Sequence, residues 1–203
     1  MRDQEGKGRF ELSRSYSLLA LIALALLMAL PPADALAQIG APGSKDSDLV
    51  SAVKGGSLIE VEKAFIHGAN ANERMKDNVP VLTVAVKAGD LRMTRLLMEK
   101  GARLDATDPA GSTALQVAAE GSDTDMTALL ISAKANPNIA DHHGETALMK
   151  AARHGAIDVV KLLLRAGADV NATEFSGRTA LSFAKEARLR GMVQILQSAG
   201  GKE

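Results

Sequence analysis

Hydrophobic positions along this chain recur with a fixed period of 33 residues. A leucine followed three residues later by alanine occurs five times, and a second apolar stretch with helical spacing follows most of these pairs. A period of this length indicates an array of stacked supersecondary units, because no single unit can bury its apolar face alone. The five pairs are Leu49/Ala52, Leu82/Ala85, Leu115/Ala118, Leu148/Ala151 and Leu181/Ala184.

The unit at residues 141–171 shows the pattern most clearly. Asp141 and Gly144 bracket a turn, since Asp bonds its own backbone and Gly tolerates positive φ. Thr146 is placed to cap a first helix and Gly155 to end it. The run 159–164 is too apolar to face water and predicts a second helix buried between neighbours. Equivalent caps are expected at Ser47, Thr113 and Thr179, and Thr113 with Gln116 predicts a capping box.

This unit closely resembles the ankyrin repeat. The resemblance covers residues 49–203 and implies an all-α solenoid of five 33-residue helix–turn–helix units with short β-turn or hairpin fingers. The family's Thr-Pro-Leu-His signature lacks its Pro and His throughout, as in Thr146-Ala-Leu-Met, which weakens the hydrogen bonds expected there but not the fold. The units lie near residues 49–72, 75–105, 108–138, 141–171 and 174–203.

Glycine is missing at three turn positions. Asn78 replaces one glycine and tolerates the left-handed region well. The third unit has Ser122 and Lys134 in place of two others, and a non-glycine residue in this conformation costs about 1–2 kcal/mol. We therefore expect the third unit to be the loosest, or to turn differently at Lys134.

The first 37 residues predict an export signal. Four basic residues precede the uninterrupted apolar run Leu18–Leu30, and Pro31 and Pro32 then lead to the small-residue tract at 35–37. The 13-residue run is short for the roughly 30 Å hydrocarbon core of a membrane, which disfavours the alternative of an uncleaved anchor. Cleavage is expected after Ala37, with a linker at residues 38–48, and the predicted location is the bacterial periplasm, or the medium as second choice.

Composition excludes several classes of function. Lysine plus arginine and aspartate plus glutamate number 24 each, so the net charge of zero gives no sign of nucleic-acid or stable membrane binding. The absence of cysteine excludes thiol catalysis, Cys-ligated metals and disulfides. No nucleotide-binding or hydrolase motif occurs, so we expect no enzyme and no cofactor. A metal-dependent enzyme using His142, His143 and His154, with Asp141 or Glu145, is the minor alternative.

The resemblance implies a partner-binding strip on the turn tips and the exposed face of the first helices. Its charge is mixed, so a folded protein is the expected partner of a monomeric chain. The strip comprises Lys76, Asp77, Val79 and Lys87 in the second unit, Pro109, Ser112 and Glu120 in the third, His142, His143, Glu145, Arg153 and His154 in the fourth, and Phe175, Ser176, Arg178 and Glu186 in the fifth.

Two interpretations of Phe175 stay open: an exposed anchor beside Arg178, or a ring that packs on the neighbouring turn at His142. The predicted function is an exported protein-binding module, a scaffold or regulator, and the alternative is a secreted effector or toxin-neutralising protein. A further hypothesis is that the three histidines of the fourth unit change the charge of the strip on acidification, since free histidine titrates near pH ~6.5.

Overall fold

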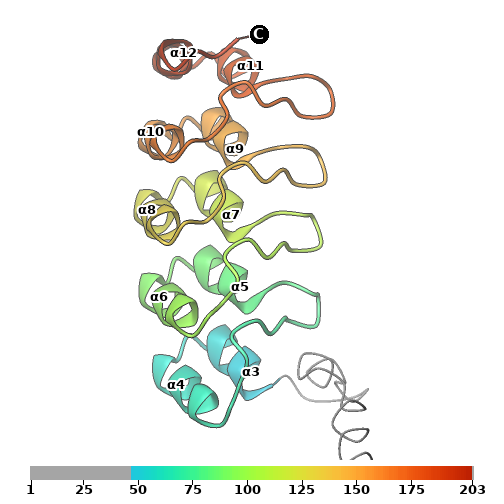
Figure 1. The fold of residues 1–203 in the computed structure, drawn as a ribbon, viewed down its shortest axis with the longest axis vertical. Helices are drawn as coiled ribbons and strands as arrows, with labels where there is room; N and C mark the ends of the chain where they lie inside the picture. Colours follow the sequence, from blue (N-terminus) through green and yellow to red (C-terminus); the bar gives the residue numbers. More distant parts are fainter. Residues whose placement is uncertain (1–46, 203) are drawn as a thin grey trace, which may run out of the picture. The chain divides into compact units, whose positions relative to one another are not determined.

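The computed structural model of the chain describes residues 47–202, which form an all-α stack of five helical pairs (Figure 1). This confirms the predicted fold class. The predicted signal peptide at residues 1–37, and the linker up to residue 46, lie outside the described residues. No helix between residues 47 and 202 has the length and apolar character needed to span a membrane.

Each pair forms one unit, and we number the units from one to five along the chain. The first helices of the pairs stack in a row next to the fingers, the loops that project to the right in Figure 1, and the second helices form an outer row. The first row is α3 (Asp48–Lys54), α5 (Val81–Lys87), α7 (Ala114–Glu120), α9 (Ala147–His154) and α11 (Ala180–Glu186). The outer row is α4 (Leu58–Ile66), α6 (Leu91–Glu99), α8 (Thr124–Ser132), α10 (Ile157–Arg165) and α12 (Arg190–Ser198).

Side-chain caps start four of the five first helices. The hydroxyl of Thr113 accepts the N–H of Gln116 at 3.3 Å, and Oε1 of Gln116 accepts the N–H of Thr113 at 2.7 Å. This reciprocal pair is the predicted capping box. The exception is α5, which begins after Pro80 without a side-chain cap. The other predicted caps are confirmed at Ser47, Thr146 and Thr179.

The turns that close the units have the same left-handed geometry whether or not glycine is present. Lys134 has a φ of 73°, close to the 87° of Gly101 and the 85° of Gly167 in the equivalent positions. The following N–H bonds the carbonyl of Leu130 at 3.1 Å, as in the neighbouring units. The expectation that the chain turns differently at Lys134 is therefore wrong, because stacking between two neighbours imposes the same path on all the units. Asn78 and Ser122 are also left-handed, and so is Arg188, which the sequence analysis missed.

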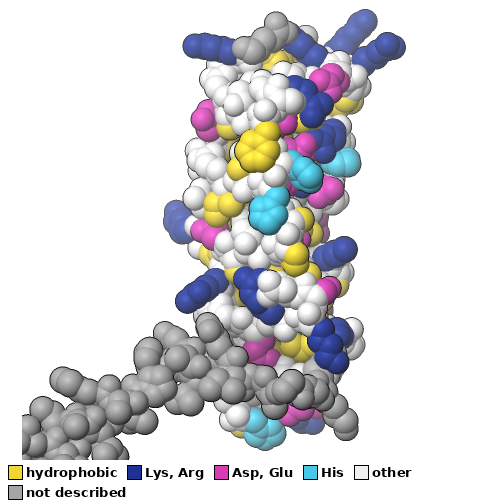
Figure 2. Space-filling view, turned by 90° about the vertical axis from the view of Figure 1, so that its right-hand side faces the viewer, with side chains coloured by type: hydrophobic (Ala, Val, Ile, Leu, Met, Phe, Trp, Pro, Cys, Tyr) yellow, Lys and Arg dark blue, Asp and Glu magenta, His cyan; other side chains and the backbone are white. Residues whose placement is uncertain are grey.

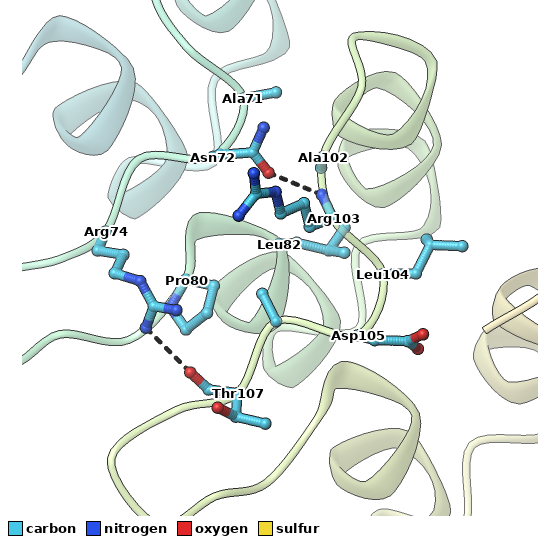
Figure 3. Close-up of a pocket in the computed structure, with 11 residues that line it drawn as sticks. Ala71, Asn72, Arg74, Pro80, Leu82, Ala102, Arg103, Leu104, Asp105 and Thr107 are labelled. Atoms are coloured by element: carbon cyan, nitrogen blue, oxygen red, sulfur yellow. Dashed lines mark hydrogen bonds between the residues drawn. The ribbon is translucent and has the colours of Figure 1, made fainter. Parts of the chain in front are cut away.

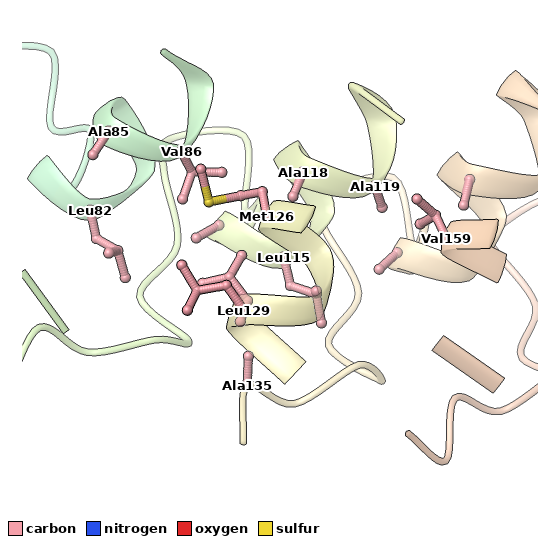
Figure 4. Packing of buried hydrophobic residues seen from close by; sticks show 14 of the residues in the cluster. Leu82, Ala85, Val86, Leu115, Ala118, Ala119, Met126, Leu129, Ala135 and Val159 are labelled. Carbon is pink, nitrogen blue, oxygen red and sulfur yellow. The ribbon is translucent and has the colours of Figure 1, made fainter. Parts of the chain in front are cut away.

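Buried apolar side chains between neighbouring units form the core. The alanines that face adjacent first helices, such as Ala119 and Ala152, are fully buried and let these helices approach closely. Figure 4 shows Val86, Leu115 and Met126 gathered between the helices of units two and three. Burial across every interface makes the stability of the array roughly a sum over neighbouring units.

Asparagine side chains clamp successive units together at the closing turns. In unit four, Oδ1 of Asn138 accepts the N–H of Asp169 at 2.8 Å, and its Nδ2 donates to the carbonyl of Gly167 at 3.0 Å. Asn72 and Asn171 make the same two bonds with the units that follow them. Each clamp uses both the acceptor and the donor of an amide, so it fixes the spacing of the units as well as their contact.

Candidate functional site

Carboxylates fix the fingers of units three, four and five. Oδ1 of Asp141 accepts the N–H groups of His143 and Glu145 at 2.9 and 3.0 Å. Asp108 and Glu174 occupy the equivalent positions, 33 residues before and after, and bond their own turns in the same way. The finger of unit two has Met75 at this position and is closed by backbone bonds alone. These fingers are pre-formed supports for the side chains at their tips.

Neighbouring fingers touch through their backbones. The N–H of His142 donates to the carbonyl of Ala110 at 3.0 Å, and that of Phe175 to the carbonyl of His143 at 3.4 Å. A Cβ atom at Gly144, whose φ is 81°, would lie 3.0 Å from Cδ1 of Phe175, so only glycine fits there. The fingertips therefore form one continuous face, on which Figure 2 shows histidine side chains gathered next to hydrophobic ones.

Phe175 lies on this face with 81% of its surface exposed. Its ring packs on the neighbouring finger, but at Gly144 and not at His142, so each of the two interpretations holds in part. Arg178 contacts a different ring: its guanidinium lies 4.5 Å from the centroid of Phe183. The expected anchor therefore consists of Phe175 against Gly144, while Arg178 stacks on a buried side chain.

Phe183 lies between two guanidinium groups. The guanidinium of Arg153 lies 4.4 Å from the ring centroid, close to the 4.5 Å of Arg178, and both arginines also bind carboxylates. Arg153 pairs with Glu145 in unit four. Arg178 pairs with Glu174 at 3.1 Å and with Glu186 at 3.5 Å in unit five. The stacked cations thus tie the fingers of units four and five to α11.

Hydrogen bonds to Glu174 hold this carboxylate in its charged form. The hydroxyl and N–H of Ser176, followed by the side chain and N–H of Arg178, lower the pKa of Glu174 to about 2 despite desolvation, which raises it. The bonds from Glu174 raise the pKa of Arg178 against a smaller opposing effect of burial. The finger of unit five therefore stays fully charged and ordered over the range in which exposed carboxylates become protonated.

A buried ion pair supports the finger of unit four from below. Nζ of Lys150 lies 3.0 Å from Oδ2 of Asp141 and 3.6 Å from Oε2 of Glu120, and the side chain of Lys150 is only 10% exposed. Burial raises the pKa of Asp141, but the bonds from Lys150 and from the N–H groups of Glu145 and His143 together lower it. Burial likewise lowers the pKa of Lys150, and the bond from Asp141 outweighs it and raises the pKa.

Four of the predicted strip residues line one groove in unit two. The groove has a volume of about 630 Å³. Three elements contribute to it: the end of α3, the finger of unit two and the last turns of α5. Its described lining consists of the predicted residues Lys76, Asp77, Val79 and Lys87, together with Lys54, Met75, Val84 and Ala88.

A second groove, of about 620 Å³, lies where units two and three join (Figure 3). Arg74 crosses its edge and donates to the carbonyls of Asn78 at 2.8 Å and Thr107 at 2.9 Å. Asn72 forms its clamp with Arg103 on another side. The polar groups of this groove thus hold the two units together.

The predicted strip residues differ in exposure. Ser112 and Glu145 are buried, because they follow the finger turns at the point where the chain enters the first helix. Val79, Arg153 and Arg178 are half-buried. The remaining ones are exposed: Lys76, Asp77, Lys87, Pro109, Glu120, His142, His143, His154, Phe175, Ser176 and Glu186.

The sequence analysis missed the roles of Phe183, Lys150 and Met75. A signal was available for Lys150 and Met75, because both break the pattern of their columns at 33-residue spacing. Within residues 47–202, no three histidine, aspartate or glutamate side chains are grouped closely enough to hold a metal ion. The carboxylates of Asp141 and Glu145, considered for the metal alternative, are engaged by Lys150 and Arg153.

Two family models match the chain. A model described as ankyrin repeats (3 copies) matches residues 49–141, and one described as ankyrin repeats (many copies) matches residues 130–184. A search of curated proteins finds no match.

Proposed function

Because the chain is an ankyrin repeat protein, a member of a family of protein-interaction modules, we propose that it is an exported scaffold or regulator that binds a protein partner in the periplasm. The observation that carries the proposal is Phe175, which is 81% exposed on a finger whose backbone is held by Glu174 and by the adjacent finger. A large apolar side chain on a rigid support loses little entropy on binding and suits an interface anchor.

The signal-like segment supports export. Residues 1–37 combine basic, apolar and small-residue regions in the order that a cleavable signal needs. Cell fractionation with N-terminal sequencing tests this part of the proposal. Mature protein that begins at Gln38 in the periplasm agrees with it, and protein in the cytosol with residues 1–37 intact contradicts it. Release into the medium instead favours the secreted effector or toxin-neutralising alternative.

Crosslinking in intact cells tests the binding function. The full chain is compared with Phe175→Ala and with Ile66→Ala, a matched control whose side chain is also 81% exposed but lies on α4, away from the fingers. We expect the wild type and Ile66→Ala to recover the same partner, and Phe175→Ala to recover about tenfold less. Equal recovery by all three chains would contradict the assignment of the anchor.

The histidine hypothesis has a test of its own. His142 and His143 are exposed on the fingertips, and His154 is exposed at the end of α9. Partner affinity is measured at about pH 5.5 and about pH 7.5, one unit either side of the free-histidine pKa, for wild type and a triple His→Gln variant. A pH dependence that the variant loses supports the hypothesis, and identical pH profiles end it.

A further inference from the structure

The groove in unit two has an apolar floor where other units have charged networks. Met75 occupies the position that Asp141 has in unit four, Val79 that of Glu145, and Val84 that of Lys150, each 66 residues earlier. In unit four these three positions hold the buried ion pair of Lys150 and the partner of Arg153. Unit five fills them with Glu174, Arg178 and Phe183, which also contact one another. The finger folds with either filling, so the apolar lining is a property of this unit and not a requirement of the fold.

Lysines surround this floor. Lys54 and Lys87 are equivalent residues in the last turns of α3 and α5, and Lys76 lies at the fingertip. The described lining of the groove contains three lysines and one acidic residue, Asp77. In the N-terminal part of the finger face, Figure 2 shows basic side chains next to hydrophobic ones.

The charge at the end of the first helix is paired in later units. Glu120 lies 3.6 Å from Lys150, Arg153 pairs with Glu145, and Glu186 lies 3.5 Å from Arg178. Lys87, the equivalent residue in unit two, has no ion-pair partner among residues 47–202. An exposed cation beside an apolar floor provides complementarity for a ligand that is both acidic and apolar.

We propose that this groove binds an acidic peptide segment of the protein partner, with an apolar side chain on Met75, Val79 and Val84 and neighbouring carboxylates facing Lys87 and Lys76. This inference rests on the proposed function and specifies the chemistry of the partner. A groove of about 630 Å³ falls within the range of natural binding clefts, roughly 300–1,000 Å³, and has room for such a side chain. Asp77 at the rim disfavours a second carboxylate on its own side and so limits the register of the peptide.

Selection from a random peptide display library against the purified full chain tests the proposal. We expect the enriched peptides to carry Asp or Glu next to Leu, Ile, Met or Phe. A labelled peptide of the enriched sequence is then measured by fluorescence anisotropy. Its affinity is expected to fall as NaCl rises from about 50 to about 300 mM, because salt screens exposed charges.

Substitutions at exposed positions locate the site without disturbing the core. Lys87→Glu reverses the charge at the rim, and Ala88→Glu places a carboxylate in the groove, so each is expected to weaken peptide binding about tenfold. Lys161→Glu is the matched control, because this exposed lysine lies on α10 in the outer row. Circular dichroism checks that all variants are folded.

Several outcomes would overturn the inference. These are a selection that enriches no peptide, enriched peptides without an excess of acidic residues, and an affinity that Lys87→Glu and Ala88→Glu leave unchanged. Self-association of the chain that Lys87→Glu abolishes would assign the groove to a second copy and would equally overturn it. A cellular partner lost by Phe175→Ala but retained by both groove variants leaves the proposed function intact and refutes this inference alone.

Discussion

The carboxylate of Asp105 accepts the backbone N–H of Asn136 at 2.9 Å and thereby makes half of an inter-unit clamp. Asn72, Asn138 and Asn171 stand at the same position in other units and also donate from Nδ2 to a carbonyl of the next turn. A carboxylate has no such donor. The connection between units three and four is therefore weaker by one hydrogen bond than the other three connections.

Replacing Asp105 with asparagine should restore this bond. We expect Asp105→Asn to raise the free energy of unfolding by about 1 kcal/mol, the net value of a typical hydrogen bond, in urea titrations followed by circular dichroism. The reverse change, Asn138→Asp, removes the donor to Gly167 and should lower stability by a similar amount. No gain in Asp105→Asn would show that the carboxylate already satisfies this turn.

Lys134 is the second weak point of unit three. Its left-handed backbone costs about 1–2 kcal/mol relative to glycine, partly offset by the greater freedom of glycine in the unfolded chain. We expect Lys134→Gly to stabilise the protein by about 0.5–1 kcal/mol in the same titration. Gly167→Lys places the same side chain at the equivalent open position in unit four and should destabilise by a similar amount. If Gly167→Lys has no effect, the strain argument fails.

Two buried threonines carry hydroxyl groups without hydrogen-bond partners among residues 47–202. Thr94 and Thr127 are fully buried in the outer helices, and the equivalent residues of the other units are Val61, Val160 and Val193. Burial of an unpaired hydroxyl costs about 1–3 kcal/mol, and valine has nearly the same shape. Thr94→Val and Thr127→Val should therefore each raise the midpoint of thermal unfolding. Thr124→Val, at an exposed position, is the control, and a lowered midpoint in both buried variants would refute the argument.

Removal of Asp141 should destabilise the protein in a pH-dependent way. Asp141→Asn leaves Lys150 buried without its closest partner and should cost on the order of 3 kcal/mol at neutral pH. The pKa of Asp141 is lowered in the folded chain, so its stabilising effect is complete above the ordinary value of 3.8 and is lost as the pH falls through the folded pKa. The difference between wild type and variant should accordingly shrink below about pH 3.8.

Denaturation at a series of pH values measures this difference. Asp125→Asn, at an exposed position in the first turn of α8, is the control and should show a much smaller difference. A cost of Asp141→Asn that stays constant from neutral pH to pH ~2 would contradict the role of the ion pair.

A double-mutant cycle tests the stacking of Arg153 on Phe183. We expect a coupling energy of about 1 kcal/mol between Arg153→Met and Phe183→Leu, because the cycle cancels the packing lost in each single variant. The cycle that combines Arg165→Met with Phe183→Leu provides the reference, since Arg165 is exposed on the outer helix α10. Equal coupling in the two cycles would show that the 4.4 Å contact adds nothing to stability.

Local patterns predicted most of the backbone. The 33-residue spacing of Leu115 and Leu148 identified the stacked helices, and Thr113 with Gln116 identified a cap, because caps and periodicity depend on residues a few positions apart. The prediction for Lys134 failed because it considered one residue in isolation. Neighbouring units on both sides hold that turn in the left-handed conformation.

The sequence by itself determined the fold class, the order of the units and the position of the fingers, since each of these follows from a repeated local code. Only the tertiary structure decided that Phe183 lies between Arg153 and Arg178, that Glu145 is buried, and that Met75, Val79 and Val84 form the floor of a groove. These side chains come from separate elements or adjacent units, and their contacts depend on how closely the units stack. A spacing pattern along the chain does not contain that distance.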